Sequence, residues 1–178
     1  MVVHTLGHST LPLDDFLALL RAHAITAIAD VRRFPGSRRH PHFTREALAP
    51  ALARAGVAYA WLPGLGGRRD PGAGSPHVAW RNPSFRAYAD HMETAGFAAE
   101  LAHLLTLASA APTAIMCAEA VPWRCHRQLI ADALLAHGIE VRHVLSSAPP
   151  GPHRLTPFAR LEGERVVYDG GQLGLARC

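Results

Sequence analysis

Residues 113–138, TAIMCAEAVPWRCHRQLIADALLAHG, decide the fold of this chain. The first five residues form a short apolar run, which is typical of a buried strand. From Cys125 to His137 the apolar residues recur at helical spacing, and Gly138 supplies a stop signal. A strand that leads through a loop into a helix is one half of a β-α-β unit. The stretch therefore predicts an α/β protein with parallel strands.

The same alternation of short apolar runs and helical patterns continues on both sides of this stretch. We predict one α/β domain over residues 1–178, with an open, mostly parallel five-stranded sheet and helices on both faces. A segment rich in glycine and proline, residues 63–83, is expected to be a long loop or lid. Residues 146–178 are expected to form a C-terminal extension with at most one short strand pair. The five expected strands are residues 2–6, 25–31, 57–62, 113–117 and 140–145.

The composition bears on the partners and the cellular location that we expect for the protein. The chain has 178 residues, 49% of them hydrophobic, and a net charge of +4. All 18 basic residues are arginine, which favours anionic partners, although coding bias of the genome explains an arginine-only composition equally well. Three cysteines do not make a disulfide framework, and the N-terminus lacks the features of a signal peptide. We expect a cytoplasmic protein with no membrane partner. The oligomeric state is not predicted.

The loop between residues 117 and 127 carries the densest set of reactive groups. A helix N-terminus next to arginine favours an anion site, so Arg127 is predicted to bind substrate. The same surroundings lower the pKa of a thiol, which makes Cys125 a candidate nucleophile assisted by His126. Glu119 is a candidate general acid or base. Cys117 is either a second reactive thiol or a small core residue, and Cys125 is either reactive or packed beneath the helix.

Further candidates lie where other strands end, and ligands of open α/β sheets bind at that edge. Asp30 is either a catalytic acid or base, or the structural partner of a nearby arginine. The remaining candidates are predicted to bind substrate, and two of them are glycines that allow a ligand to approach the backbone. These residues are His8, Ser9, Arg32, Arg38, Gly66 and Gly67.

Several known motifs do not fit the sequence. Six residues separate Cys117 from Arg124, whereas cysteine phosphatases have five, and the loop between them lacks glycine. The glycines near residue 66 lead into a loop, so they form neither a dinucleotide fingerprint nor a P-loop. No histidine or cysteine spacing matches a recognised zinc motif, so no metal ligands are predicted. The sequence does not identify a cofactor.

Four motifs together resemble the family called domain of unknown function 488, over about residues 3 to 145. The resemblance implies an α/β domain whose marked residues belong to one site, and it implies no reaction or substrate. The motifs, in chain order, are residues 5–9 (TLGHS), residues 30–38 (DVRRFPGSR), Tyr59 with residues 62–67 (LPGLGG), and residues 117–119 (CAE) with residues 125–127 (CHR).

These observations favour an enzyme that binds an anionic substrate, phosphorylated or nucleotide-like, at the carboxyl edge of the sheet. Two alternatives stay open. The arginine excess also fits a nucleic-acid-binding module. Cys117, Cys125 and His126 also fit a metal or thiol-redox protein, which requires their donor atoms to lie within bonding reach of one another.

Overall fold

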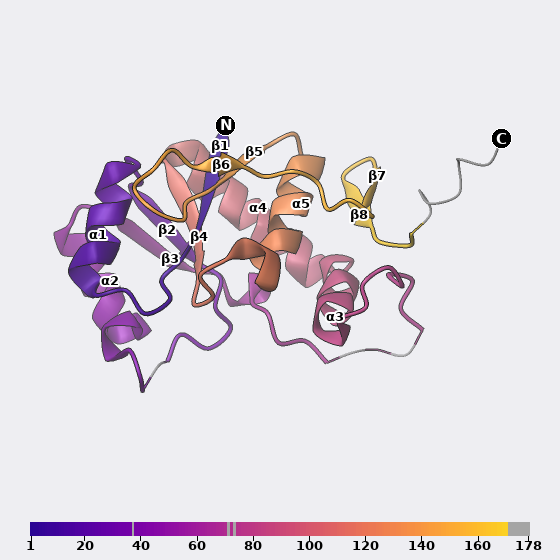
Figure 1. The fold of residues 1–178 in the computed structure, drawn as a ribbon, viewed down its shortest axis with the longest axis horizontal. Coiled ribbons are helices and arrows are strands. Elements are labelled where there is room, and N and C mark those ends of the chain that lie inside the picture. The colour runs from indigo at the N-terminus through magenta and orange to yellow at the C-terminus, as the bar shows by residue number, and fades with distance from the viewer. Residues whose placement is uncertain (37, 71, 73, 171–178) are drawn as a thin grey trace.

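Six strands form the main sheet of the computed structural model, in the order β3-β2-β4-β1-β5-β6. The first five strands of this order pair in parallel, and β6 joins β5 antiparallel (Figure 1). The structure describes residues 1–36, 38–70, 72 and 74–170. The strands are β1 (Val2–Gly7), β2 (Ala27–Asp30), β3 (Ala58–Trp61), β4 (Thr113–Cys117), β5 (Glu140–His143) and β6 (Gly151–Pro152).

The prediction of an open, mostly parallel α/β sheet is confirmed, but the count of five strands is wrong by one. The strand that was missed, β6, has only two residues, Gly151 and Pro152. Glycine and proline are both depleted in strands, and so short a segment has no alternating pattern to detect. Its pairing with β5 depends on tertiary position alone.

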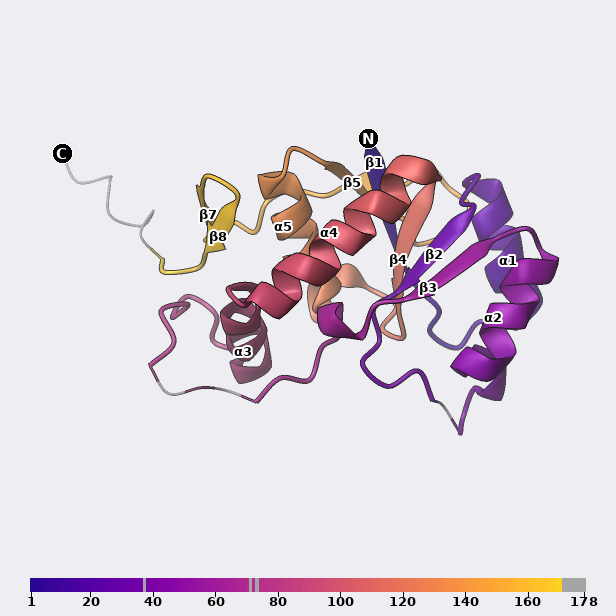
Figure 2. The ribbon, with the colours of Figure 1, turned by 180° about the vertical axis from the view of Figure 1, so that it is seen from behind.

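Five helices cover the two faces of the sheet. They are α1 (Leu13–Ala22), α2 (Arg45–Arg54), α3 (Pro83–Met92), α4 (Ala95–Ala110) and α5 (Arg127–Ala136), with short 3₁₀ turns η1 (Pro41–Phe43), η2 (Pro63–Leu65) and η3 (Pro122–Arg124). Residues of α1 and α2 belong to one buried cluster, and residues of α3, α4 and α5 belong to the other. Figure 2 shows α4 running along its face of the sheet. No helix in the described part of the chain has the length and apolarity needed to cross a bilayer.

The central strands are buried on both faces, which explains their continuous apolar runs. In β2, Ile28 packs into the cluster beneath α1 and α2, while the next residue, Ala29, packs into the cluster beneath α4 and α5. Because successive side chains of a strand point to opposite faces, one strand serves both cores. The polar ends of these strands consequently emerge together at one edge.

The N-termini of α1, α2 and α3 differ in how they are capped. Thr44 caps α2, its hydroxyl accepting from the Ala47 N–H at 3.4 Å. α1 begins at Leu13, after Pro12, without a side-chain cap. Asn82 caps α3, its side-chain oxygen accepting from the Ser84 N–H at 2.9 Å.

The C-terminal extension is tied to the domain by a buried polar network. Asp132 of α5 accepts hydrogen bonds from the hydroxyls of Thr156 (2.7 Å) and Tyr168 (2.8 Å), and its other oxygen lies 2.9 Å from His153 Nε2. His153 Nδ1 lies 3.0 Å from His143 Nε2 on β5. The extension also forms the expected strand pair, β7 (Arg160–Glu162) with β8 (Arg165–Val167). Its residues 171–178 lie outside the described part of the chain.

Candidate functional site

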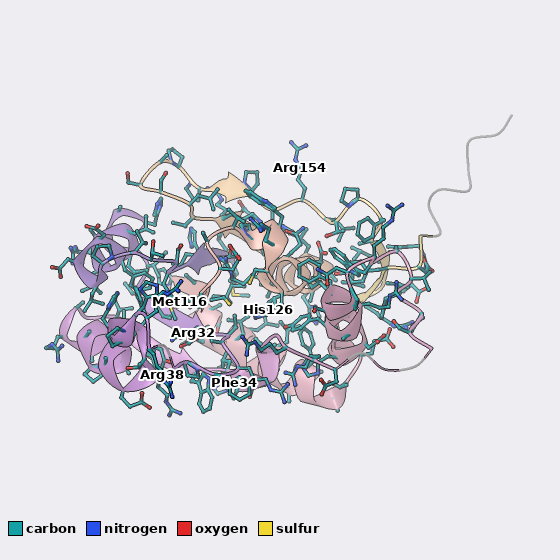
Figure 3. The ribbon with its side chains drawn as sticks, turned by 60° about the horizontal axis from the view of Figure 1, so that its bottom comes forward. Arg32, Phe34, Arg38, Met116, His126 and Arg154 are labelled. Atoms are coloured by element: carbon teal, nitrogen blue, oxygen red, sulfur yellow. The ribbon has the colours of Figure 1, made fainter. Side chains whose placement is uncertain are left out.

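A cleft of about 640 Å³ lies at the carboxyl ends of β2 and β4, where the sequence analysis expects a ligand. Its walls come from the loop after β2, the loop after η2, the start of α3 and the loop between β4 and α5. In Figure 3, Arg32 and His126 lie near the centre of the molecule and Phe34 lies below them. The lining residues are Arg32, Arg33, Phe34, Gly36, Gly67, Arg68, Ser84, Phe85, Tyr88, Cys117, Ala118, Glu119, Arg124, Cys125 and His126.

The loop from β4 to α5 is held in place by backbone contacts and one buried arginine. The N–H groups of His8 and Ser9 each donate at 3.0 Å, to the carbonyls of Cys117 and Ala118 respectively. Arg127 is fully buried, and its guanidinium donates to the carbonyl of Glu119. Thus Arg127, which the sequence predicts to bind substrate, is turned toward the backbone of the loop and is not part of the cleft wall.

Two thiols and an imidazole meet on the wall of the cleft. Cys117 ends β4, whereas Cys125 and His126 directly precede α5. The sulfurs of both cysteines and a ring nitrogen of His126 all lie within 4.8 Å of one another. His126 Nε2 lies 3.1 Å from the Val31 carbonyl, and a carbonyl only accepts, so Nε2 carries a proton. In the neutral ring Nδ1 is then an acceptor, and it faces Cys125 Sγ at 3.5 Å.

These contacts shift the pKa values of the two thiols in opposite directions. The hydrogen bond from Cys117 lowers the pKa of Cys125, and the hydrogen bond to His126 lowers it further. The pKa of Cys117 is raised, first by its hydrogen bond to Cys125 and then by burial. Because the thiolate is the reactive form of cysteine, the lowered pKa makes Cys125 the more reactive sulfur of the two.

The same three donor atoms are the one group of this kind that the described residues offer to a metal ion. Two thiolates and an imidazole suit a soft ion such as zinc. The charge of the cleft opposes this use, since the described residues that line it include four arginines and one acid, Glu119. Such a surface favours an anionic occupant over a divalent cation. The sequence spacings of known zinc motifs do not detect this cluster, because Cys117 lies before the loop and Cys125 and His126 lie after it.

The carboxylate of Asp30 is occupied by neighbouring side chains. Arg32 donates to it twice, from Nε at 2.8 Å and from Nη2 at 2.5 Å, and the Tyr59 hydroxyl donates at 2.7 Å. Asp30 is fully buried and Arg32 is 7% exposed. Burial, followed by the hydrogen bond to Asp30, raises the pKa of Tyr59, so this hydroxyl keeps its proton. The geometry favours the structural alternative for Asp30, and we give it no part in the chemistry proposed below.

His8 belongs to the same buried group. Its Nε2 lies 3.2 Å from Arg32 Nη1, and its ring stacks on Phe43 with a centroid separation of 4.1 Å. Burial and the positive charge of Arg32 lower the pKa of His8 to about 4. The neutral ring accepts from the guanidinium, so His8 helps to orient Arg32 and does not line the cleft.

The lowered pKa values of His8 and His143 predict a loss of stability in acid. Burial and the neighbouring His153 lower the pKa of His143 to about 4, against 6.5 for an unperturbed histidine. Unfolded chains therefore bind protons first, and the stabilisation is complete above pH 6.5 and lost as pH falls toward 4. Each histidine contributes a slope of about 1.4 kcal/mol per pH unit in that window. Urea unfolding between pH 4 and 7 measures it, and equal stability at pH 4.5 and 7 would contradict it.

Three arginines of the cleft wall were not among the predicted site residues. Arg68 and Arg124 are exposed, and Arg33 is half-buried with its guanidinium donating to the Arg68 carbonyl at 2.5 Å. Arg33 and Arg68 come from segments 35 residues apart, and this hydrogen bond joins them at the cleft. The sequence feature that could have indicated Arg33 and Arg68 is that each belongs to a pair of adjacent arginines, at residues 32–33 and 68–69. Sequence alone does not show which member of each pair faces a cleft.

The other predicted residues fall into two groups. Glu119 lines the cleft and is exposed, and Gly67 lines it beside His126. A Cβ on Gly67 would lie 2.8 Å from His126 Nδ1, so glycine there leaves room for the imidazole. Ser9, Gly66 and Arg38 do not line the cleft. In Figure 3 Arg38 lies near the lower edge of the molecule.

Comparison with known proteins places the chain in a family. A search of curated proteins and a search of solved structures each returned no match. The sequence model of a family described as "Domain of unknown function DUF488" matches residues 12–134. This range covers more than half of the chain and includes the second, third and fourth of the four sequence motifs, including the loop from Cys117 to Arg127. The chain therefore belongs to the family of the domain of unknown function DUF488.

Proposed function

We propose that this protein is an enzyme that binds an anionic substrate in the cleft and attacks it with the thiolate of Cys125. The observation that carries the proposal is the position of Cys125 Sγ, 3.5 Å from His126 Nδ1 in an arginine-lined cleft. A nucleophile beside a base that a third group orients is the arrangement that covalent catalysis uses. Here the third group is the Val31 carbonyl.

The proposed roles follow from the placement of the groups. His126 Nδ1 takes the proton of the Cys125 thiol, and the resulting thiolate forms a bond to an electrophilic atom of the substrate. Arg33, Arg68 and Arg124 hold the anionic group of the substrate. Glu119, the one acid of the cleft wall, exchanges a proton with the leaving group.

The proposal calls for thiols that stay reduced, which fits the cytoplasmic location expected from the sequence. A nucleotide-like substrate fits the combination of arginines with Phe34, Phe85 and Tyr88 in the lining. Nucleic-acid binding remains an untested prediction, and no contact among the described residues favours it over a small anion.

The proposal can be tested without knowing the substrate, by comparing two alkylating agents of similar size. Iodoacetamide is neutral and reports the thiolate, whereas iodoacetate is anionic and also senses the arginines. We use a Cys178→Ser background, which leaves Cys117 and Cys125 as the only thiols. Cys125 is expected to react with iodoacetate roughly tenfold faster than with iodoacetamide at low salt. Mass mapping of peptides locates the modification.

Two variants separate the contributions of charge and base. Arg68→Gln is expected to reduce the iodoacetate preference while the iodoacetamide rate stays within twofold. Gly67→Ala displaces His126 and is expected to slow both reagents by on the order of tenfold. Gly72→Ala is the matched control from the same loop, because a Cβ there meets no atom within 4 Å. A Cys125 that reacts like a free cysteine, with no preference for iodoacetate, would overturn the proposal.

A further inference from the structure

We infer that Cys117 and Cys125 form an oxidative-modification site, in which a hydroperoxide oxidises Cys125 and Cys117 converts the product to an intramolecular disulfide. The inference rests on the proposed function in one respect, since it uses the same reactive sulfur of Cys125. It gives a further role to Cys117, which in the proposed attack only lowers the pKa of Cys125. It also assigns a chemical class of second reactant, a hydroperoxide.

The geometry supports the pairing of the two sulfurs. They approach from opposite sides of the loop, one at the end of β4 and one just before α5, and lie within 4.8 Å of each other. A disulfide has a sulfur–sulfur bond of about 2.05 Å, so closure requires a movement of less than about 3 Å. Rotation of the two side chains supplies part of this movement. Cys125 is 5% exposed and Cys117 is half-buried, and both line the cleft, so a small oxidant can reach them there.

The part of the loop just before Cys125 can supply the rest of the movement. Trp123, which is 58% accessible, and Arg124 are exposed, whereas residues 118–120 are held by Ser9, Arg127 and the close approach of Gly7. The backbone bonds of Cys117 to β1 and the start of α5 anchor the two ends of the loop. A closed ring of nine residues therefore forms without displacing the sheet or the helix.

The chemistry proceeds in two balanced steps. The Cys125 thiolate attacks one oxygen of hydrogen peroxide, the O–O bond breaks, and the products are a sulfenic acid and hydroxide, which takes up a proton to become water. The Cys117 thiol then attacks the sulfenic sulfur, a sulfur–sulfur bond forms, and the hydroxyl leaves as a second water with the thiol proton. Two electrons pass from the two thiols to the peroxide. A dithiol reductant returns both cysteines to thiols.

The order of events follows from the contacts. Cys125 Sγ lies 3.5 Å from His126 Nδ1, the base that takes its proton, whereas Cys117 lies within 4.8 Å of Cys125 and keeps its own proton because its pKa is raised. Cys125 is thus the sulfur that peroxide meets as a thiolate. Cys117 is already placed beside the sulfur that it must attack. Formation of the disulfide removes the nucleophile from the cleft, so oxidation switches the proposed activity off reversibly.

The test uses the full chain with Cys178→Ser, stripped of metal by a chelator and treated with one equivalent of hydrogen peroxide. The expected product is a monomer lighter by two hydrogens, with residues 117 and 125 in one cross-linked peptide, and dithiothreitol restores the original mass. With Cys117→Ser the sulfenic acid of Cys125 has no partner, and dimedone is expected to trap it. With Cys125→Ser neither product forms. Cys117→Ala is a second variant with a smaller side chain, in case the serine hydroxyl disturbs the fold.

Three results would overturn the inference: dimedone labelling of Cys125 to the same extent with and without Cys117, oxidation directly to sulfinic acid, or a tightly bound metal ion at one per chain before chelation. The alkylation experiment distinguishes this failure from failure of the proposed function. If Cys125 prefers iodoacetate but no disulfide forms, only the oxidation site is rejected. If Cys125 is unreactive toward both iodoacetate and peroxide, both proposals are rejected.

Discussion

Replacing Asp30 by alanine is expected to lower the free energy of unfolding by about 3–5 kcal/mol, because it leaves the charge of Arg32 buried without a counter-ion. Asp30 is fully buried, and Arg32 spends two of its donors on the carboxylate. The Tyr59 hydroxyl loses its acceptor in the same variant. Urea unfolding at pH 7 measures the loss.

Two further variants show whether the buried charge is the cause. Glu140→Ala removes an ion pair with Arg142 in which both side chains are nearly half exposed, and it should cost less than about 1 kcal/mol. The double variant Asp30→Ala, Arg32→Met removes both charges, and it should be more stable than Asp30→Ala alone. A cost of the single variant no larger than that of Glu140→Ala would refute this account of Asp30.

Gly7→Ala is expected to destabilise the protein by about 3 kcal/mol and to disturb the reactive loop directly. A Cβ at position 7 would overlap the carbonyl oxygen of Glu119 and lie 2.6 Å from its carbon and 2.9 Å from Ala120 Cα. All of these are backbone atoms, so no side-chain rotation relieves the overlap. The same carbonyl of Glu119 accepts from Arg127, and the loop that moves carries Cys125.

The expected result therefore has two parts, a lower midpoint of thermal unfolding and a slower alkylation of Cys125 in the protein that remains folded. Gly151→Ala is the control, because a Cβ there has no neighbour within 4 Å. Its stability and alkylation rate should match those of the parent protein. A Gly7→Ala variant with unchanged stability would show that the loop after β4 has room to move, which the contacts of Gly7 contradict.

The position of Gly7 illustrates a signal that sequence reasoning could not use. Glycine at the end of a strand has several explanations, and only the structure shows that the chain passes close by at residue 119. The same holds for Gly67, which the sequence analysis expected to face a ligand. The structure places its Cα against the imidazole of His126, an interaction between residues separated by 59 positions. Contacts of this range leave no periodic trace in a sequence.

The sequence by itself determined the sheet, its parallel character and the edge at which polar residues gather. Local rules suffice there, because a strand buried on both faces must be continuously apolar, and parallel strands need helical crossovers. The same rules failed for β6, since two residues carry no pattern. The same rules could not decide whether Asp30 is a catalytic group or a structural partner of an arginine, because the Tyr59 hydroxyl that binds it lies on a different strand, β3.

Only the tertiary structure decided which of the candidate site residues lie together on the wall of one cleft. It turned Arg127 inward, set Arg38 apart from the cleft, and brought Cys117 and Cys125 together beside His126. The physical reason is that side-chain direction depends on strand order and loop path, which arise from packing of the two cores. Propensity and spacing determine the elements of this protein, and packing determines the chemistry that those elements place in one cleft.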